Sequence, residues 1–164
     1  MSLLSSLPSP WWLLALGVTV ADQWSKWWIE VHLPVGSHLP VLSGFLHLTH
    51  LKNPGFALGW LADAPPALLL ILAMAAFGVT VYLFTTTPRR YPLALACFAL
   101  LVGGAAGNLL DRLAVGEVTD WARFLSPQLP TFNLADAAIS LSLIGLVATL
   151  ARARRADSPP SMES

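Results

Sequence analysis

Four long apolar stretches constrain the fold of this chain more than any other feature of its sequence. A helix needs about 20 predominantly apolar residues to cross the hydrocarbon core of a bilayer. The second stretch carries no charge, and the third and fourth meet charged residues only near one end. The charge-free part of the first stretch is too short to span, so a crossing helix there must include Asp22 and Lys26. We therefore predict four transmembrane helices, at residues 11–31, 67–84, 91–113 and 134–151.

The composition supports a membrane protein and excludes several other classes. Charged residues make up 11% of the chain, against about 25% in a typical soluble domain, while hydrophobic residues make up 55%. The net charge of zero leaves no basic stripe for nucleic acid. The single cysteine, Cys97, excludes an internal disulfide and a cysteine-based metal cluster. We expect one integral membrane domain over residues 1–157 and a disordered cytoplasmic tail at 158–164.

Arginines set the expected orientation in the membrane. With four spans, the connector between the second and third stretches lies on the same side as the C-terminal region, and the positive-inside rule makes that side the cytoplasm. The arginines that would share this side are Arg89, Arg90, Arg152, Arg154 and Arg155. Both termini are then cytoplasmic, and the connectors at 32–66 and 114–133 face outward. The expected location is the inner, cytoplasmic membrane, with several crossings.

The first outward connector contains a strand-like segment. Residues 41–51 mix apolar and β-forming types, and turn-forming residues such as Gly44 and Asn53 interrupt or follow them. The predicted fold class is therefore an all-α membrane protein of four transmembrane helices with a small outer-face β-cradle in this connector. His47 and His50 would lie on opposite faces of such a strand, so we interpret them as interfacial or solvated residues and not as metal ligands.

The expected orientation brings the polar residues of the apolar stretches to one depth. The first and third stretches run outward and the fourth runs inward, so their polar residues all fall near the outer interface. Ionisable residues at membrane depth are costly, and by default they indicate a functional site. The residues that would meet there are Asp22, Lys26, Asn108, Asp111, Arg112, Asp120, Asn133 and Asp136.

Some of these residues also have a purely structural interpretation. Asp22 and Lys26 stand at i,i+4 in the favourable order, so they could simply neutralise each other. Asn133 and Asp136 fit a helix N-cap followed by an acid at the third helical position, a variant of the capping box. Asp120, in the connector between the third and fourth stretches, has no comparable structural explanation.

The clustered carboxylates point to one kind of chemistry. Two carboxylates in a partly dry site cannot both ionise easily, so they share one proton. The ionised member can activate a water while the protonated one polarises a carbonyl, which is aspartic peptidase chemistry without metal or cofactor. The chain has no G-x-S-x-G or H-E-x-x-H motif, and adjacent Ser25 and Lys26 point about 100° apart on a helix. Spacing alone does not decide whether Asp111 or Asp120 pairs with Asp136.

Five sequence blocks resemble the lipoprotein signal peptidases, the bacterial signal peptidase II family. Each block alone is weak, but the five in this order are highly specific and cover most of the chain. The blocks are Asp22-Gln-Trp-Ser-Lys26, Asn53-Pro-Gly55-Phe-Ala-Leu-Gly59, Gly103-Gly-Ala-Ala-Gly-Asn108-Leu-Leu-Asp111-Arg112, Val118-Thr-Asp120-Trp121 and Phe132-Asn133-Leu-Ala-Asp136. They are similar to the family's D-Q-x-[ST]-K, N-x-G-A-A-F-G, G-G-A-x-G-N-x-x-D-R, V-V-D-F and F-N-x-A-D. Phe56 and Leu58, and likewise Thr119 and Trp121, depart from this pattern.

The resemblance implies an aspartic endopeptidase that removes the signal peptide from diacylglyceryl-modified prolipoproteins, cutting before the lipidated cysteine. It implies an active site near the outer membrane face, with Asp120 and Asp136 as the catalytic pair. The expected partners are the prolipoprotein and membrane lipid, and we expect a monomer. By resemblance, the supporting and substrate-binding positions are Asp22, Lys26, Asn53, Gly55, Asn108, Asp111, Arg112, Asn133 and Ala135.

Two functions from other classes could use the same residues. A small proton- or ion-coupled membrane carrier could use the buried acids, but it should place its binding groups near the bilayer midplane. A structural membrane protein with interfacial ion pairs is the other alternative. It predicts that neutralising Asp120 harms stability more than activity.

Overall fold

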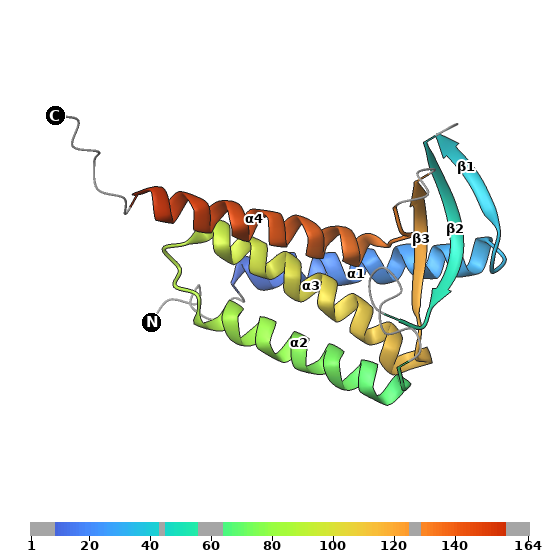
Figure 1. Ribbon diagram of the computed structural model, residues 1–164, viewed down its shortest axis with the longest axis horizontal. Coiled ribbons are helices and arrows are strands. Elements are labelled where there is room, and N and C mark those ends of the chain that lie inside the picture. The colour runs from blue at the N-terminus through green and yellow to red at the C-terminus, as the bar shows by residue number, and fades with distance from the viewer. Residues whose placement is uncertain (1–8, 43–44, 56–63, 125–128, 157–164) are drawn as a thin grey trace.

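In the part of the chain that the computed structural model describes, residues 9–42, 45–55, 64–124 and 129–156, four long helices carry a three-stranded sheet at one end (Figure 1). The elements are α1 (Pro10–His32), β1 (His38–Leu42), β2 (Leu46–Asn53), α2 (Pro66–Thr86), α3 (Pro92–Val115), β3 (Val118–Phe124) and α4 (Leu134–Ala156). The predicted tail at 158–164 lies outside the described residues, as do Phe56 and Leu58.

The helices begin and end where local sequence signals place them. α1, α2 and α3 each have a proline in the first turn, where the missing N–H costs nothing: Pro10, Pro66 and Pro92. α3 ends at Gly116, whose φ of 80° lies in the left-handed region that favours glycine. The predicted cap of α4 is confirmed, because the Asp136 N–H donates to Asn133 Oδ1 at 2.9 Å and the Asn133 N–H donates to Asp136 Oδ2 at 3.3 Å.

Three of the described helices are long and apolar enough to cross a membrane by length and composition. They cover Pro66–Thr86, Pro92–Val115 and Leu134–Arg152. α1 overlaps the first predicted span and has 23 residues, but it is not among these three. Its sequence is interrupted by Asp22, Lys26 and Glu30.

α3 is the central helix, because α1, α2 and α4 all pack against it. Two glycines let neighbouring backbones come close: a Cβ at Gly103 would lie 2.5 Å from the Ala15 carbonyl oxygen in α1, and one at Gly104 would lie 2.6 Å from the Ala135 carbonyl oxygen in α4. Small residues at helix contacts are the usual means of close packing in membranes, where lipid is as apolar as the side chains. The glycines therefore set the spacing of α1, α3 and α4.

The apolar core lies away from the sheet. Its buried residues join the beginning of α1, the end of α2 and the first half of α3: Ala15, Phe84, Leu95, Ala99 and Val102. The sheet end of the bundle, by contrast, buries charged and polar side chains. The molecule thus has one apolar end and one polar end.

The sheet corrects the predicted β-cradle. The order is β1-β2-β3 and all pairs are antiparallel. The first outward connector supplies two strands where one strand-like segment was predicted at 41–51, because β1 ends at Leu42 and β2 begins at Leu46. The third strand, however, comes from the connector between α3 and α4, which the sequence analysis did not predict to be a strand. Its pairing with β2 joins residues distant in sequence, and local patterning does not reveal such contacts.

A register shift in β2 changes which residues face Asp120. Leu48 pairs with Ala122, but Leu51 pairs with Asp120, so β2 has one extra residue between these positions. His50, at the shift, is buried with 4% of its surface exposed, and its Nδ1–H donates to the Leu33 carbonyl at 2.7 Å. The interpretation of His50 as interfacial or solvated is therefore wrong, because the shift turns the ring inward.

The glycine contacts predict a stability difference between two substitutions. Gly104→Ala should lower the free energy of unfolding by about 1–3 kcal/mol, since its Cβ meets backbone of α4. Gly78→Ala in α2 is the matched control, because a Cβ there meets nothing within 4 Å. Thermal unfolding in detergent measures both, and equal midpoints for the two variants would contradict the packing described for α3.

Candidate active site

A buried lysine holds two aspartates at the sheet end of the helices. Lys26 Nζ lies 2.7 Å from Asp22 Oδ2 and 2.8 Å from Asp111 Oδ2. Asp22 is fully buried and Lys26 is 3% exposed. Asp22 and Lys26, which the sequence analysis considered as a possible neutralising pair, do form an ion pair, and Asp111 from α3 joins it. Such a buried charge cluster requires every member, because removing one partner leaves an uncompensated charge.

Asp22 also connects α1 to α4. Its Oδ1 accepts the Ala135 N–H at 2.8 Å, in the first turn of α4 where helical N–H groups have no partner within the helix. A Cβ on Gly107 of α3 would overlap the Asp22 carboxylate, so glycine there leaves the space that this carboxylate occupies. α1, α3 and α4 are thereby held at one polar contact.

Asp111 is held by several groups beneath the sheet. Its Oδ1 accepts the Gln23 side-chain amide at 2.8 Å, and its Oδ2 accepts the Thr119 N–H at 3.4 Å in addition to the Lys26 contact. Gln23 is a residue that the sequence analysis missed, although it lies within the Asp22 to Lys26 block. These contacts use both Asp111 oxygens inside the protein.

Asparagine side chains link the two other aspartates. Asn133 Nδ2 donates to Asp120 Oδ1 at 2.8 Å and to Asn108 Oδ1 at 3.1 Å. Asn108 Nδ2 in turn donates to Asp136 Oδ1 at 2.8 Å, and Lys26 Nζ donates to Asn108 Oδ1 at 2.9 Å. An unbroken series of hydrogen bonds therefore joins Asp120 to Asp136 and both to the buried lysine.

Asp120 occupies the middle of β3 and is 3% exposed. Asn53 on β2 donates its side-chain N–H to Asp120 Oδ2 at 2.8 Å, so each carboxylate oxygen accepts one amide hydrogen. Burial raises the pKa of the Asp120 carboxyl to about 6, and the charge of Asp136 adds to the rise. The amides of Asn53 and Asn133 act in the opposite direction, because they stabilise the ionised form.

Asp136 lies in the first turn of α4, where the capping hydrogen bonds fix its direction. The position also favours a negative charge, because the N-terminus of a helix carries a partial positive charge. Asp120 and Asp136 thus lie in different settings: one is buried on a strand, and the other is half-buried at a helix start.

Both aspartates line one cavity of about 960 Å³ between the sheet and the helices. Arg112 lines it too, and its guanidinium donates to the Gly55 carbonyl at 2.7 Å and the Asn108 carbonyl at 3.3 Å. Below the polar groups the walls are apolar or small, formed from α2, α3 and α4 by Ala73, Ala76, Ala105, Leu109, Ala137, Ile139 and Ser140. Asp111 does not line this cavity.

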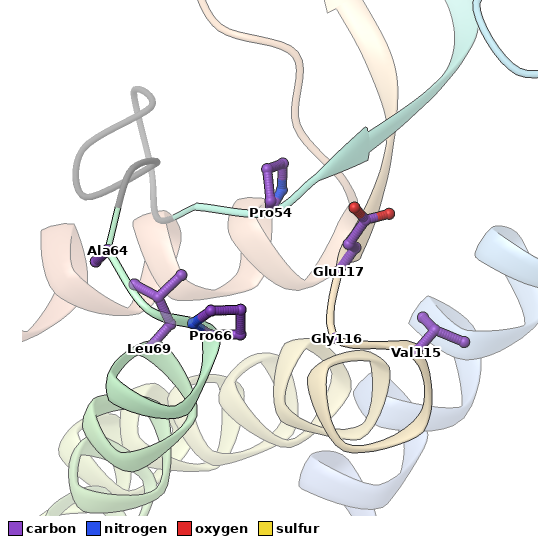
Figure 2. Close-up of a pocket in the computed structure, with 7 residues that line it drawn as sticks. All are labelled: Pro54, Ala64, Pro66, Leu69, Val115, Gly116 and Glu117. Carbon is purple, nitrogen blue, oxygen red and sulfur yellow. The ribbon is translucent and has the colours of Figure 1, made fainter.

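A smaller cavity of about 470 Å³ is lined by residues from the start of α2 and the turn between α3 and β3 (Figure 2). Pro54 borders both cavities. Among the residues that the structure describes, Glu117 is the only acid that lines the smaller cavity, and none of the predicted site residues lines it. The predicted chemistry therefore gathers in the larger cavity.

The structure brings the predicted site residues together in two layers. Asn53, Asn108, Arg112, Asp120 and Asp136 line the cavity, while the layer beneath consists of Asp22, Lys26, Asp111 and Asn133. Gly55 and Ala135 contribute through their backbones, the first through the carbonyl that Arg112 binds and the second through the N–H that Asp22 accepts.

Comparisons of the sequence with known proteins point to one family. Residues 14–152 match the sequence model of the family described as Signal peptidase (SPase) II. The chain is 40% identical over 136 residues to the lipoprotein signal peptidase of Moorella thermoacetica, an alignment that covers 82% of this chain and 88% of that protein. It is 37% identical over 156 residues to that of Gloeobacter violaceus, covering 94% and 90%.

A solved structure has the same fold. A bacterial membrane enzyme determined by the in meso method at 2.3 Å superposes with a TM-score of 0.83 at 26% identity, covering 92% of this chain and 93% of that one. Taken with the match over residues 14–152, these likenesses show that the chain belongs to the signal peptidase II family, the lipoprotein signal peptidases that process prolipoproteins.

Proposed function

We propose that Asp120 and Asp136 are the catalytic pair of this peptidase, which removes the signal peptide from diacylglyceryl-modified prolipoproteins by cutting before the lipidated cysteine. The observation that carries the proposal is that both carboxylates line the same cavity and are joined through Asn133 and Asn108. Asp111 is the weaker candidate, because Lys26 and Gln23 engage its two oxygens and it does not line the cavity.

The pair cleaves the peptide by sharing one proton. The ionised carboxylate takes a proton from a water molecule, and the water oxygen bonds to the scissile carbonyl carbon. The protonated carboxyl gives its proton to the carbonyl oxygen, which stabilises the tetrahedral intermediate. The carbon–nitrogen bond then breaks as the leaving amine takes a proton from the pair and one hydroxyl of the intermediate returns a proton to it. The carboxyl and amine products separate, and the pair again holds one proton. Asn53, Asn108 and Asn133 hold the two acids throughout.

The cavity walls fit a lipid-modified peptide. The part lined by α2, α3 and α4 is apolar or small, which suits a signal peptide entering sideways from the bilayer, since its acyl chains prefer hydrocarbon. Arg112 and the two carboxylates lie at the sheet end of this cavity, where the scissile bond would lie. The membrane lipid therefore surrounds the substrate before it binds, and the substrate reaches the cavity through the lipid.

α1 is the fourth membrane span in this proposal. Its charged residues Asp22 and Lys26 are buried against the other helices, while Leu16, Val20 and Trp24 on other faces are exposed. A helix that buries the charges of its middle turns and exposes apolar side chains there is suited to lipid.

Orientation follows from the arginines and the sheet. Arg89 and Arg90, in the turn between α2 and α3, lie at the opposite end of the bundle from the sheet (Figure 1). The positive-inside rule then puts both termini in the cytoplasm and the sheet at the outer face of the inner membrane. The single domain over residues 1–157 acts as a monomer, since this one chain supplies all the catalytic groups that we propose.

Neutralising either acid should abolish turnover without unfolding the protein. Asp120→Asn and Asp136→Asn are each expected to lower the kcat for cleavage of a diacylglyceryl-modified prolipoprotein by about a hundredfold or more, because each removes a proton-transfer group. Glu117→Gln at the smaller cavity should keep wild-type kcat. The proposal fails if either aspartate variant stays folded, as judged by thermal unfolding, and retains near wild-type turnover.

The pH dependence of kcat/KM should follow the ionisation of the Asp120 carboxyl. Its carboxyl, with a pKa of about 6, is protonated below that pH and ionised above it, so the singly protonated pair is lost as pH rises. The corresponding falling limb of kcat/KM should move to higher pH in Asn53→Ala, because the lost amide N–H stabilises the ionised form. A limb that stays in place or moves to lower pH would contradict this assignment.

Thiol labelling tests the fourth span. In a Cys97→Ala background, Val35→Cys lies beyond the sheet end of α1 and should react with a membrane-impermeant reagent in intact cells. Ser9→Cys, at the start of α1, should react only after the membrane is permeabilised. If both positions react from outside, α1 does not cross the bilayer.

A further inference from the structure

The two residues beside Asp120 in the sequence both form side-chain hydrogen bonds to α1. Thr119 Oγ1 donates to Glu30 Oε1 at 2.5 Å, near the end of α1. Trp121 Nε1 donates to Ser25 Oγ at 3.2 Å, more than one turn earlier in the same helix. Neither bond belongs to the series that joins the two acids, and both flank the strand position of Asp120.

Both hydrogen bonds lie on the same face of β3. Successive side chains on a strand point to opposite faces, so Thr119 and Trp121 share one face of β3 while Asp120 points from the other. Two hydrogen bonds on one face therefore fix the rotation of the strand about its own axis. That rotation decides whether the Asp120 carboxyl meets Asn53 and Asn133, which hold it at 2.8 Å on each side.

Each bond is itself held firmly. Lys52 on β2 pairs with Glu30 and donates to Thr119 Oγ1 at 2.8 Å, so the threonine hydroxyl accepts one hydrogen bond and donates another. Ser25 donates its hydroxyl hydrogen to the Asp22 main-chain oxygen at 2.7 Å, which leaves its lone pairs turned to the indole. The charge of Glu30 makes its bond the stronger of the two.

α1 is a suitable anchor because the buried ion cluster fixes it. Asp22, which precedes Ser25 in the sequence, binds the start of α4. Lys26, which follows Ser25, binds Asp111 of α3. We propose that Glu30 and Ser25 are positioning residues for the reaction: acting through Thr119 and Trp121, they orient β3 so that Asp120 faces the cavity. This proposal rests on the catalytic role of Asp120 proposed above.

Paired substitutions at Thr119 separate hydrogen bonding from packing. Thr119→Val keeps the branched shape but loses the hydroxyl, whereas Thr119→Ser keeps the hydroxyl but loses the methyl group. We expect Thr119→Val to lower kcat for prolipoprotein cleavage about tenfold with KM within about twofold, since misorienting a reacting group costs rate. Thr119→Ser should keep kcat within about twofold of wild type. A packing role predicts the reverse order and would overturn the proposal.

Substitutions at Glu30 and Trp121 supply independent variants, one for each bond. Glu30→Gln keeps an acceptor oxygen but removes the charge that strengthens the bond, so it should lower kcat less than Thr119→Val does. The double variant should be no slower than Thr119→Val alone, because the valine already removes this bond. Trp121→Phe should lower kcat about threefold, judged against Trp27→Phe, whose ring is exposed on α1. Glu117→Gln is the control for Glu30→Gln.

The outcomes distinguish this inference from the proposed function. If Asp120→Asn is inactive while Glu30→Gln and Thr119→Val both keep wild-type kcat, the positioning role is wrong and the catalytic pair stands. If Asp120→Asn is folded and active, the catalytic role fails and the positioning role fails with it. Thermal unfolding midpoints within a few degrees of wild type show that a lower kcat does not come from unfolded protein.

Discussion

The structure depends on the buried contact of one ammonium with two carboxylates, Lys26 with Asp22 and Asp111. Burying three charges costs desolvation free energy, and the attraction within such a cluster offsets that cost only when all of its hydrogen bonds are made. Here they are made by parts of three helices, including the Ala135 N–H at the start of α4. The cluster therefore specifies how α1, α3 and α4 meet, and the loops and strands are arranged on that fixed base.

The carboxylates that meet at this end of the molecule have different surroundings. Asp22 and Asp111 face a lysine and do not line the cavity, whereas Asp120 and Asp136 face amides and do. Amide donors hold a carboxylate in place without adding a positive charge, so the proton affinity of the pair stays adjustable. Membership of the peptidase family favours this hydrolytic arrangement over a carrier.

The sequence predicted the long helices, and it predicted that polar residues gather at one end of them, for physical reasons. Apolar length and proline positions are local properties, and Asn133 with Asp136 is a local capping pattern. The pairing of β3 with β2 is not local, and so the third strand was missed. The choice between Asp111 and Asp120 depends on where each side chain points, which spacing does not encode; motif resemblance favoured Asp120, and the cavity lining agrees with that choice.

The extra residue in β2 divides that strand into two segments, and the alternation of side chains between the two faces of the sheet starts anew in the second segment. Residues 46–48 follow one register against β3 and residues 51–53 follow another. A slip or a length change in the hairpin formed with β1 would be absorbed at the boundary, since a one-residue shift reverses which face a side chain takes. The rim of the sheet can thus change in length while Asn53 keeps its side-chain hydrogen bond to Asp120.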